Sequence, residues 1–136
     1  MEKIINLKKK FKSVKIDGYI VPKNNEFFGE YIPDHEDRLK YISNFTGSYG
    51  FALILRNKNY LFVDGRYTLQ GEKQSGNSFK IKTIPNIMPT DVLKIKKLKI
   101  GFDPRLFTKK TLELFFKKTN CKYIPIEKNL IDKIWK

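Results

Sequence analysis

Asp64 and Arg66, on either side of Gly65, are the two side chains whose types and spacing best suit chemistry in this sequence. They directly follow an apolar run, Tyr60 to Val63, so a carboxylate and a guanidinium are expected where a strand ends. Gly65 would let the chain turn sharply there with a positive φ. The two groups either brace each other within the domain or face a cleft and bind a ligand. The brace is the more common arrangement in proteins.

The other reactive side chains form no catalytic pattern. The sequence has 14 acidic residues but a single histidine, His35, and it lacks a metal-binding spacing such as HExxH. His35 could serve as the base for a Cys121 nucleophile, but Cys121 lies beside an expected buried strand with no motif around it. No glycine-rich phosphate loop is present. The chain by itself is therefore predicted to be catalytically inactive, and its single cysteine excludes an internal disulfide.

The strand before Asp64 belongs to a predicted β-hairpin. Two apolar runs, Tyr49 to Leu55 and Tyr60 to Val63, are joined by the short polar segment Arg56 to Asn59. Both runs are apolar at nearly every position, which indicates strands that are covered on both faces by helices. The residues after the hairpin, 66–70, are expected to be helical.

Helices and strands alternate along the rest of the chain. Apolar residues at helical spacing predict a first helix over 2–14, which Asp17 and Gly18 would close. Asp34 is expected to cap a short helix, and Thr108 a later one. These patterns predict one α/β domain over residues 1–136, a three-layer arrangement with a mixed sheet between helices. The other expected strands cover 19–21, 79–84, 98–102 and 123–124, and the other expected helices cover 36–42, 89–97, the residues after Thr108, and 129–135.

The loop after the first strand, residues 23–33, combines carboxylates with aromatic side chains. Glu26, Phe27, Phe28, Glu30 and Tyr31 all lie in this loop. They could form a binding edge, because loops on a rigid scaffold often carry function. They could equally form a small hydrophobic cluster of the loop itself.

The formal net charge of +14 raises nucleic acid or an anionic membrane as a partner. The positive residues are 24 lysines and 4 arginines, and they are scattered along the whole sequence. Specific recognition of bases and phosphates favours arginine, and no stacking aromatic pattern of a known module is present. Nucleic acid is therefore predicted to be an improbable partner. A free-standing basic module that binds nucleic acid or an acidic partner is the alternative function.

The sequence also indicates where the protein resides. No apolar run is long enough to span a bilayer. The first helix, 2–14, could lie on a membrane surface, but packing on the sheet is favoured, so no membrane association is expected. The first residues, MEKIINLKKKFK, have neither the apolar core of a secretory signal nor the composition of an organelle transit peptide. A cytoplasmic location is the expectation.

Two motifs resemble the N-terminal domain of Xaa-Pro aminopeptidases, in the creatinase and prolidase superfamily. They are FTGSYG at 45–50 and LFVDGRYTLQ at 61–70. Three further pieces agree in order and spacing, namely GYIVP at 18–22, GEY at 29–31 and NLIDKIW at 129–135. There are two departures. Phe27-Phe28 stands where many members have His-Gln, and Ser43-Asn44-Phe45 stands where the family usually has Ser-Gly-Phe.

This resemblance implies a function for the domain. The fold would be of the ribonuclease H-like type, without nuclease activity. In the family, two metal ions, usually manganese, lie in a C-terminal domain that this chain is expected to lack, and the whole enzyme removes an N-terminal residue that precedes proline. The N-terminal domain walls the substrate cleft and supports oligomer contacts, such as those of a dimer. The positions that match the family motifs are candidates for cleft or interface roles: Glu30, Tyr31, Arg38, Asp64 and Arg66.

Overall fold

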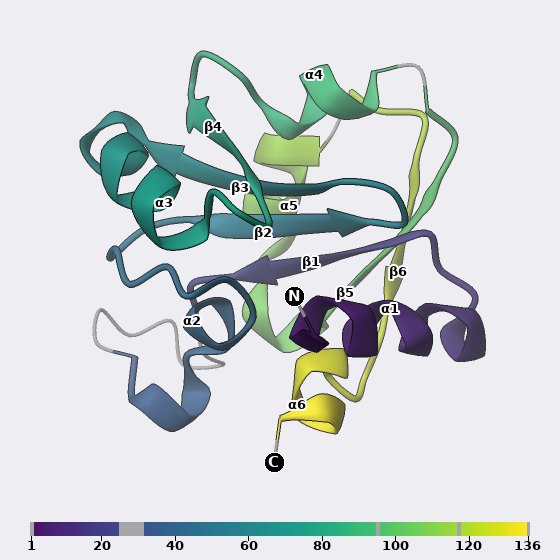
Figure 1. The fold of residues 1–136 in the computed structure, drawn as a ribbon. Helices are drawn as coiled ribbons and strands as arrows, with labels where there is room; N and C mark the ends of the chain where they lie inside the picture. Colours follow the sequence, from purple (N-terminus) through teal and green to yellow (C-terminus); the bar gives the residue numbers. More distant parts are fainter. Residues whose placement is uncertain (1, 25–31, 95, 117, 136) are drawn as a thin grey trace.

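A mixed six-stranded sheet forms the centre of the described part of the chain (Figure 1). The computed structural model describes residues 2–24, 32–94, 96–116 and 118–135. β2 is antiparallel to both of its neighbours, and the other neighbouring pairs are parallel. The predicted mixed sheet is confirmed. From one side to the other, the strands are β4 (Lys80–Ile84), β3 (Asn59–Asp64), β2 (Phe51–Leu55), β1 (Gly18–Pro22), β5 (Lys99–Phe102) and β6 (Lys122–Pro125).

Helices cover both faces of this sheet (Figure 1). One face carries α1 (Glu2–Val14), α2 (Arg38–Ser43), α3 (Thr68–Ser75) and α6 (Leu130–Ile134). The opposite face carries α4 (Pro89–Leu93) and α5 (Lys109–Phe116). In the described residues, three short 3₁₀ helices lie between these elements: η1 (Asp34–Glu36), η2 (Gly65–Tyr67) and η3 (Pro104–Leu106).

The central strands bury side chains on both faces. In β3, Leu61 and Val63 belong to the core under α1, α2, α3 and α6, whereas Tyr60 and Phe62 belong to the core under α4 and α5. This alternation explains why the strands are apolar at nearly every position, because neither face is left to solvent. The predicted hairpin is confirmed, although β2 begins at Phe51, two residues later than expected.

Helix α1 has the predicted bounds but ends in a different way. Lys15 adopts a left-handed backbone with φ of 57°, and the Ile16 N–H donates to the Phe11 carbonyl at 3.0 Å. This is the hydrogen bond of a Schellman-type helix end. The prediction that Asp17 and Gly18 close the helix is wrong. Gly18 lies inside β1, where a Cβ atom would come within 2.6 Å of a Leu55 methyl group.

Lys15→Gly is expected to raise the free energy of unfolding by about 0.5 to 1 kcal/mol, because a Cβ atom strains the left-handed backbone. Lys12→Gly, three residues earlier and inside α1, is expected to lower it by about 1 kcal/mol. Urea unfolding of the two variants measures both changes. If both variants lose stability, the Cβ atom of Lys15 does not strain the end of this helix, and the prediction is wrong.

Helix α2 is capped by Asp37 and not by Asp34 as predicted. Asp37 Oδ1 accepts a hydrogen bond from the Lys40 N–H at 3.1 Å, whereas Asp34 opens η1. At the other end, Asn44 is left-handed with φ of 67°. This is the position where the family pattern has glycine, and asparagine is the other residue that tolerates this conformation.

The other predicted elements are present with different bounds: β1 and β6 are longer than expected, whereas β4, β5 and α6 are shorter. The segment expected to be helical at 66–70 is the end of η2 followed by the start of α3. Helix α4 ends at Leu93, four residues before the expected end. Thr108 Oγ1 accepts a hydrogen bond from the Thr111 N–H at 3.0 Å, as predicted for the cap of α5. β4 is an edge strand, and its residues are exposed or partly exposed.

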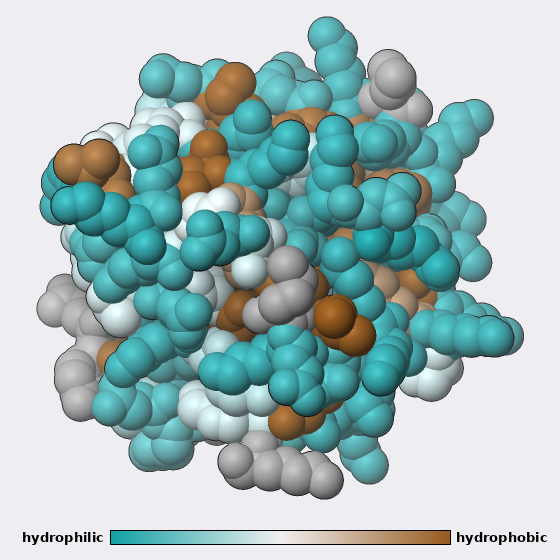
Figure 2. All heavy atoms as spheres, in the orientation of Figure 1, coloured by the Kyte–Doolittle hydropathy of each residue, from teal (hydrophilic) through white to brown (hydrophobic). Residues whose placement is uncertain are grey.

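Hydrophilic side chains dominate the face shown in Figure 2. Among the described residues, no helix combines the length and the apolar composition that crossing a membrane requires.

Candidate functional site

Polar side chains gather where the parallel strands end. Every strand except β2 runs in one direction, so β1, β3 and β5 end at the same side of the sheet, which we call the carboxyl edge. In open α/β sheets, ligands bind at this edge. The segments that leave it here are Lys23-Asn24, Asp64 to Arg66 and Asp103 to Arg105.

Asp64 and Arg66 form a local ion pair after β3. Asp64 Oδ1 accepts the Arg66 backbone N–H at 2.9 Å, and Asp64 Oδ2 lies 2.9 Å from Arg66 Nη2. The hydrogen bond from the guanidinium holds the pKa of Asp64 below its usual value. The Arg66 side chain is nevertheless 74% exposed. Asp64 therefore orients a guanidinium that remains in contact with solvent.

Gly65 does not have the positive φ that the sequence suggested. No described glycine has a positive φ, and Gly65 begins η2 in a right-handed turn. The turn is formed by the Asp64 carboxylate, which binds the backbone two residues ahead. A Cβ atom at Gly65 would meet one methyl group, that of Thr83, at 4.0 Å.

Asp103 and Arg105 repeat this arrangement after β5, but the carboxylate is buried. Asp103 Oδ2 lies 2.8 Å from Arg105 Nη2 and 2.9 Å from Asn129 Nδ2, and its side chain is 1% exposed. Burial by itself would raise the pKa of Asp103, but the hydrogen bonds from Arg105 and Asn129 lower it below the ordinary value. Sequence reasoning missed this pair, although a second Asp-x-Arg after an apolar strand was the available signal.

Arg38 is engaged within the domain. Its Nε and Nη2 atoms lie 2.8 and 2.9 Å from the two carboxylate oxygens of Asp132, and its side chain is 12% exposed. Hydrogen bonding to Asp132 raises the pKa of Arg38. Tyr41 reinforces the contact between α2 and α6, because its ring stacks on Trp135 with 4.7 Å between centroids. The NLIDKIW segment is thus fixed to α2.

An ion pair and a small cavity also lie at the carboxyl edge. Lys23 forms a largely buried ion pair with Asp37, the cap of α2. Beside it lies a small cavity of about 60 Å³ whose walls come from the end of β1, the start of β2 and α5. Tyr49, at the mouth of this cavity, is half-exposed, and partial burial raises the pKa of its hydroxyl.

The ring of Tyr67 supports the exposed arginine. The Arg66 guanidinium lies 5.2 Å from the centre of the Tyr67 ring, within the range of a cation–π contact. The Tyr67 hydroxyl is hydrogen-bonded to the Ser48 hydroxyl. The FTGSYG and DGRY motifs therefore meet at this edge, where the segment before β2 lies beside the turn after β3.

Glu30 and Tyr31, together with Phe27 and Phe28, lie outside the described residues. Their predicted roles stay predictions. Of the other candidates, the structure brings Asp64 and Arg66 together and joins Arg38 to Asp132.

In the part of the chain that the structure describes, no group of three or more His, Cys, Asp and Glu side chains could hold a metal ion. His35 lies in η1. Cys121 precedes β6, and its thiol donates to the Lys96 carbonyl at 3.5 Å. Neither His35 nor Cys121 belongs to a group of described side chains that could hold a metal ion.

Known proteins are similar to this chain in both sequence and fold. Residues 3–134 match the family described as Creatinase/Prolidase N-terminal domain. A probable Xaa-Pro aminopeptidase P of Laccaria bicolor is 32% identical over 143 residues, which cover 98% of this chain and 22% of that protein. Aminopeptidase P2 of Arabidopsis thaliana is 36% identical over 148 residues, covering 99% of this chain and 21% of that protein. The chain thus spans about a fifth of these relatives.

Solved structures give the same result. The X-prolyl aminopeptidase of Caenorhabditis elegans, described as a cytosolic enzyme with a di-nuclear active site, superposes with a TM-score of 0.87 at 28% identity. That match covers 98% of this chain and 25% of the C. elegans chain. The N-terminal domain of the cytoplasmic peptidase PepQ from Mycobacterium tuberculosis H37Rv shares the fold with a TM-score of 0.73 at 16% identity, over 98% of both chains. With its mixed sheet and its family match over nearly the whole length, the chain belongs to the creatinase/prolidase N-terminal domain family.

Proposed function

We propose that this chain is the non-catalytic N-terminal domain of an Xaa-Pro aminopeptidase. The relatives that match nearly its whole length are named probable Xaa-Pro aminopeptidase P and aminopeptidase P2, and the match covers about a fifth of each. The two divalent metal ions, manganese by the family pattern, would be held by a catalytic domain outside this chain. The full-length enzyme would act in the cytoplasm, as a dimer, and would remove the residue that precedes proline at the N-terminus of a peptide.

The exposed guanidinium of Arg66 supports a role for this domain in the substrate cleft. Of the five N–H groups of an arginine side chain, Asp64 takes two, which leaves three for a ligand on a side chain that is largely exposed. Such a group binds carbonyl or carboxylate oxygens of a peptide with charge-assisted hydrogen bonds. Asp64 lowers the cost of binding, because it already orders the side chain that must meet the ligand. The domain would thereby form one wall of the cleft.

The proposal predicts that purified residues 1–136 fold but do not hydrolyse a peptide with proline at its second position, even with added manganese. The isolated PepQ N-terminal domain has been solved as a separate chain of the same fold, so folding of the fragment is expected. A sensitive assay for the dipeptides and tripeptides beginning with proline that such cleavage would release tests the predicted absence of hydrolysis. Turnover that persists through rigorous purification would contradict the proposal.

A further inference from the structure

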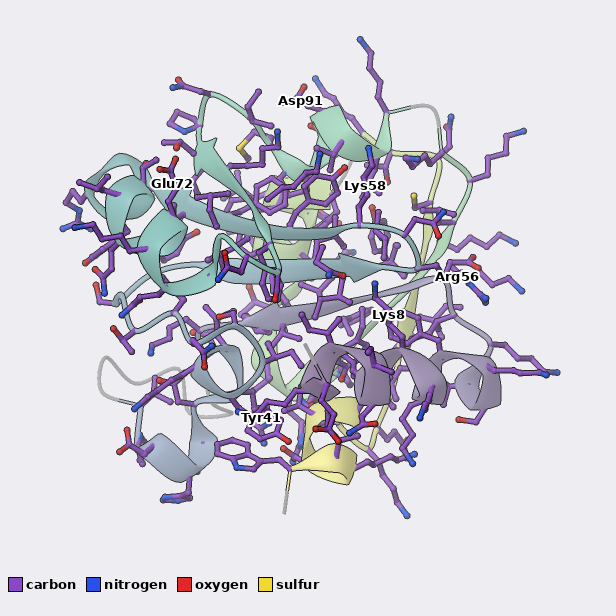
Figure 3. All side chains as sticks on the ribbon, viewed as in Figure 1. Lys8, Tyr41, Arg56, Lys58, Glu72 and Asp91 are labelled. Carbon is purple, nitrogen blue, oxygen red and sulfur yellow. The ribbon has the colours of Figure 1, made fainter. Side chains whose placement is uncertain are left out.

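Basic side chains gather at the side of the sheet opposite the carboxyl edge, where the parallel strands begin. We call them the amino-edge cluster and define it as Arg56, Lys58, Lys96, Lys97, Lys99 and Lys122, all of them exposed. They come from the turn between β2 and β3, the segment before β5, and the first residues of β5 and β6. In Figure 3, the labelled Arg56 lies at the end of the hairpin, on the side where many nitrogen-tipped side chains extend into solvent.

The cluster is continuous across the sheet. Lys99 and Lys122 are register partners in the parallel pair of β5 and β6, so their backbones lie about 4.8 Å apart. Arg56, Lys58 and Lys96 line one surface cavity of about 200 Å³. The row from β3 to β6 crosses four strand spacings, or about 20 Å. Like charges in register destabilise a sheet, so folding alone gives no reason for Lys99 and Lys122 to be paired.

Few carboxylates balance this charge. Asp17 lies 3.3 Å from Arg56 Nε and also accepts the Lys99 backbone N–H at 2.9 Å. Within residues 2–24, 32–94, 96–116 and 118–135, no carboxylate lies within ion-pair distance of the five lysines of the cluster.

The carboxyl edge is different, because each of its described cations has a carboxylate partner. Lys23 is paired with Asp37, and the two arginines that follow β3 and β5 are paired with Asp64 and Asp103. Folding therefore separates a neutralised edge from an edge with uncompensated positive charge.

We propose that the amino-edge cluster binds the phosphate backbone of nucleic acid without reading its sequence. Exposed lysines gain affinity for a polyanion by releasing its counterions, and this mechanism requires no fixed side-chain geometry. Isolated surface ion pairs with protein carboxylates contribute little, so an acidic protein is the weaker candidate. The exposed large hydrophobic residues of the described chain, Ile5, Tyr49, Leu69, Ile87 and Leu114, lie outside the cluster, which gives a membrane no apolar anchor there. This proposal is independent of any role in peptide hydrolysis.

Fluorescence anisotropy with a labelled oligouridine of about twenty nucleotides tests the proposal. The affinity of the native chain is expected to fall about 100-fold between about 50 and 200 mM salt, as for contacts to about five phosphates. In an edge variant, glutamine replaces Lys58, Lys96, Lys99 and Lys122. The slope of log affinity against log salt is expected to be less steep by about three for this variant than for the native chain. A control variant with the same change in net charge has the exposed lysines Lys73, Lys109, Lys128 and Lys133 replaced by glutamine.

The control variant is expected to bind within about twofold of the native chain at low salt, whereas the edge variant binds at least tenfold more weakly. Circular dichroism and thermal unfolding should show that the edge variant is no less stable, because the substitution removes the repulsion between Lys99 and Lys122. Three results overturn the proposal: no binding at about 50 mM salt, equal losses in both variants, or tighter binding of a polyglutamate peptide of matched length.

Discussion

Asp103→Asn is expected to lower the free energy of unfolding by about 2 to 3 kcal/mol, a large part of the stability of a domain this size. The carboxylate is buried and accepts hydrogen bonds from the Arg105 side chain and from Asn129 Nδ2. An amide of the same shape would turn an NH₂ group toward one of these donors and leave it without an acceptor, and it would remove the charge that Arg105 faces. Urea unfolding measures the change. The loss is smaller than the value of about 3 to 5 kcal/mol expected for a fully buried ion pair, because Arg105 is partly exposed.

Asp64→Asn is the matched control, because it makes the same substitution in the same Asp-x-Arg turn at the surface. Stability is expected to change little there, since water replaces the lost contacts of Arg66. Equal losses in the two variants would show that burial does not set the cost.

The stabilisation by Asp103 should also depend on pH. Folding lowers the pKa of this carboxyl group, so its contribution is complete above the unfolded value of about 4 and is lost as the pH falls through the lower native pKa. The difference in stability between the native chain and Asp103→Asn should therefore be largest near neutral pH and should shrink below about pH 4. A constant difference down to about pH 2 would contradict this assignment.

Arg66→Gln is expected to raise the KM of the full-length enzyme for proline-containing peptides about tenfold, with a smaller change in kcat. The proposal places the guanidinium on the cleft wall, where it would contact the peptide equally in the ground state and in the transition state. Such uniform binding changes KM and leaves the chemical step unaltered. Steady-state kinetics with a series of peptides of increasing length would separate the two constants.

Arg56→Gln provides the control, because Arg56 is also exposed and paired with an aspartate, but it lies at the amino edge. Its kinetic constants are expected to match those of the native enzyme. Asp64→Asn should raise KM less than Arg66→Gln, since the guanidinium remains but is less well ordered. An unchanged KM for Arg66→Gln would remove Arg66 from the cleft.

Much of the fold was predictable because burial on two faces leaves a simple pattern in the sequence. The hairpin strands are apolar at nearly every position, and α1 repeats its apolar residues at helical spacing, so both elements were placed within two residues. The errors concern short-range hydrogen bonds. Lys15 ends α1 and Asp37 caps α2, although neighbouring glycine and aspartate residues gave equally good local signals. Local competition of this kind is decided by tertiary packing.

The candidate site was only partly predictable. The Asp64 and Arg66 pair could be anticipated because two residues of spacing is enough for a turn to join them. Arg38 and Asp132 are 94 residues apart, so no local pattern pointed to their contact. The same holds for Asp103, which follows β5, and Asn129, which caps α6, because they are 26 residues apart.

The sequence by itself determined the family, the alternation of helices and strands, and the large positive charge, because these depend on residue types and their spacing. The tertiary structure decided where that charge lies. Lysines that are scattered along the chain become neighbours at the starts of β5 and β6, since parallel strands place their first residues at one edge. At the opposite edge, Lys23 meets Asp37 across 14 residues of sequence, whereas Arg66 and Arg105 are each paired with the aspartate two residues before them. Which of the two Asp-x-Arg turns is buried was also set by packing, because only Asp103 lies under the C-terminal segment.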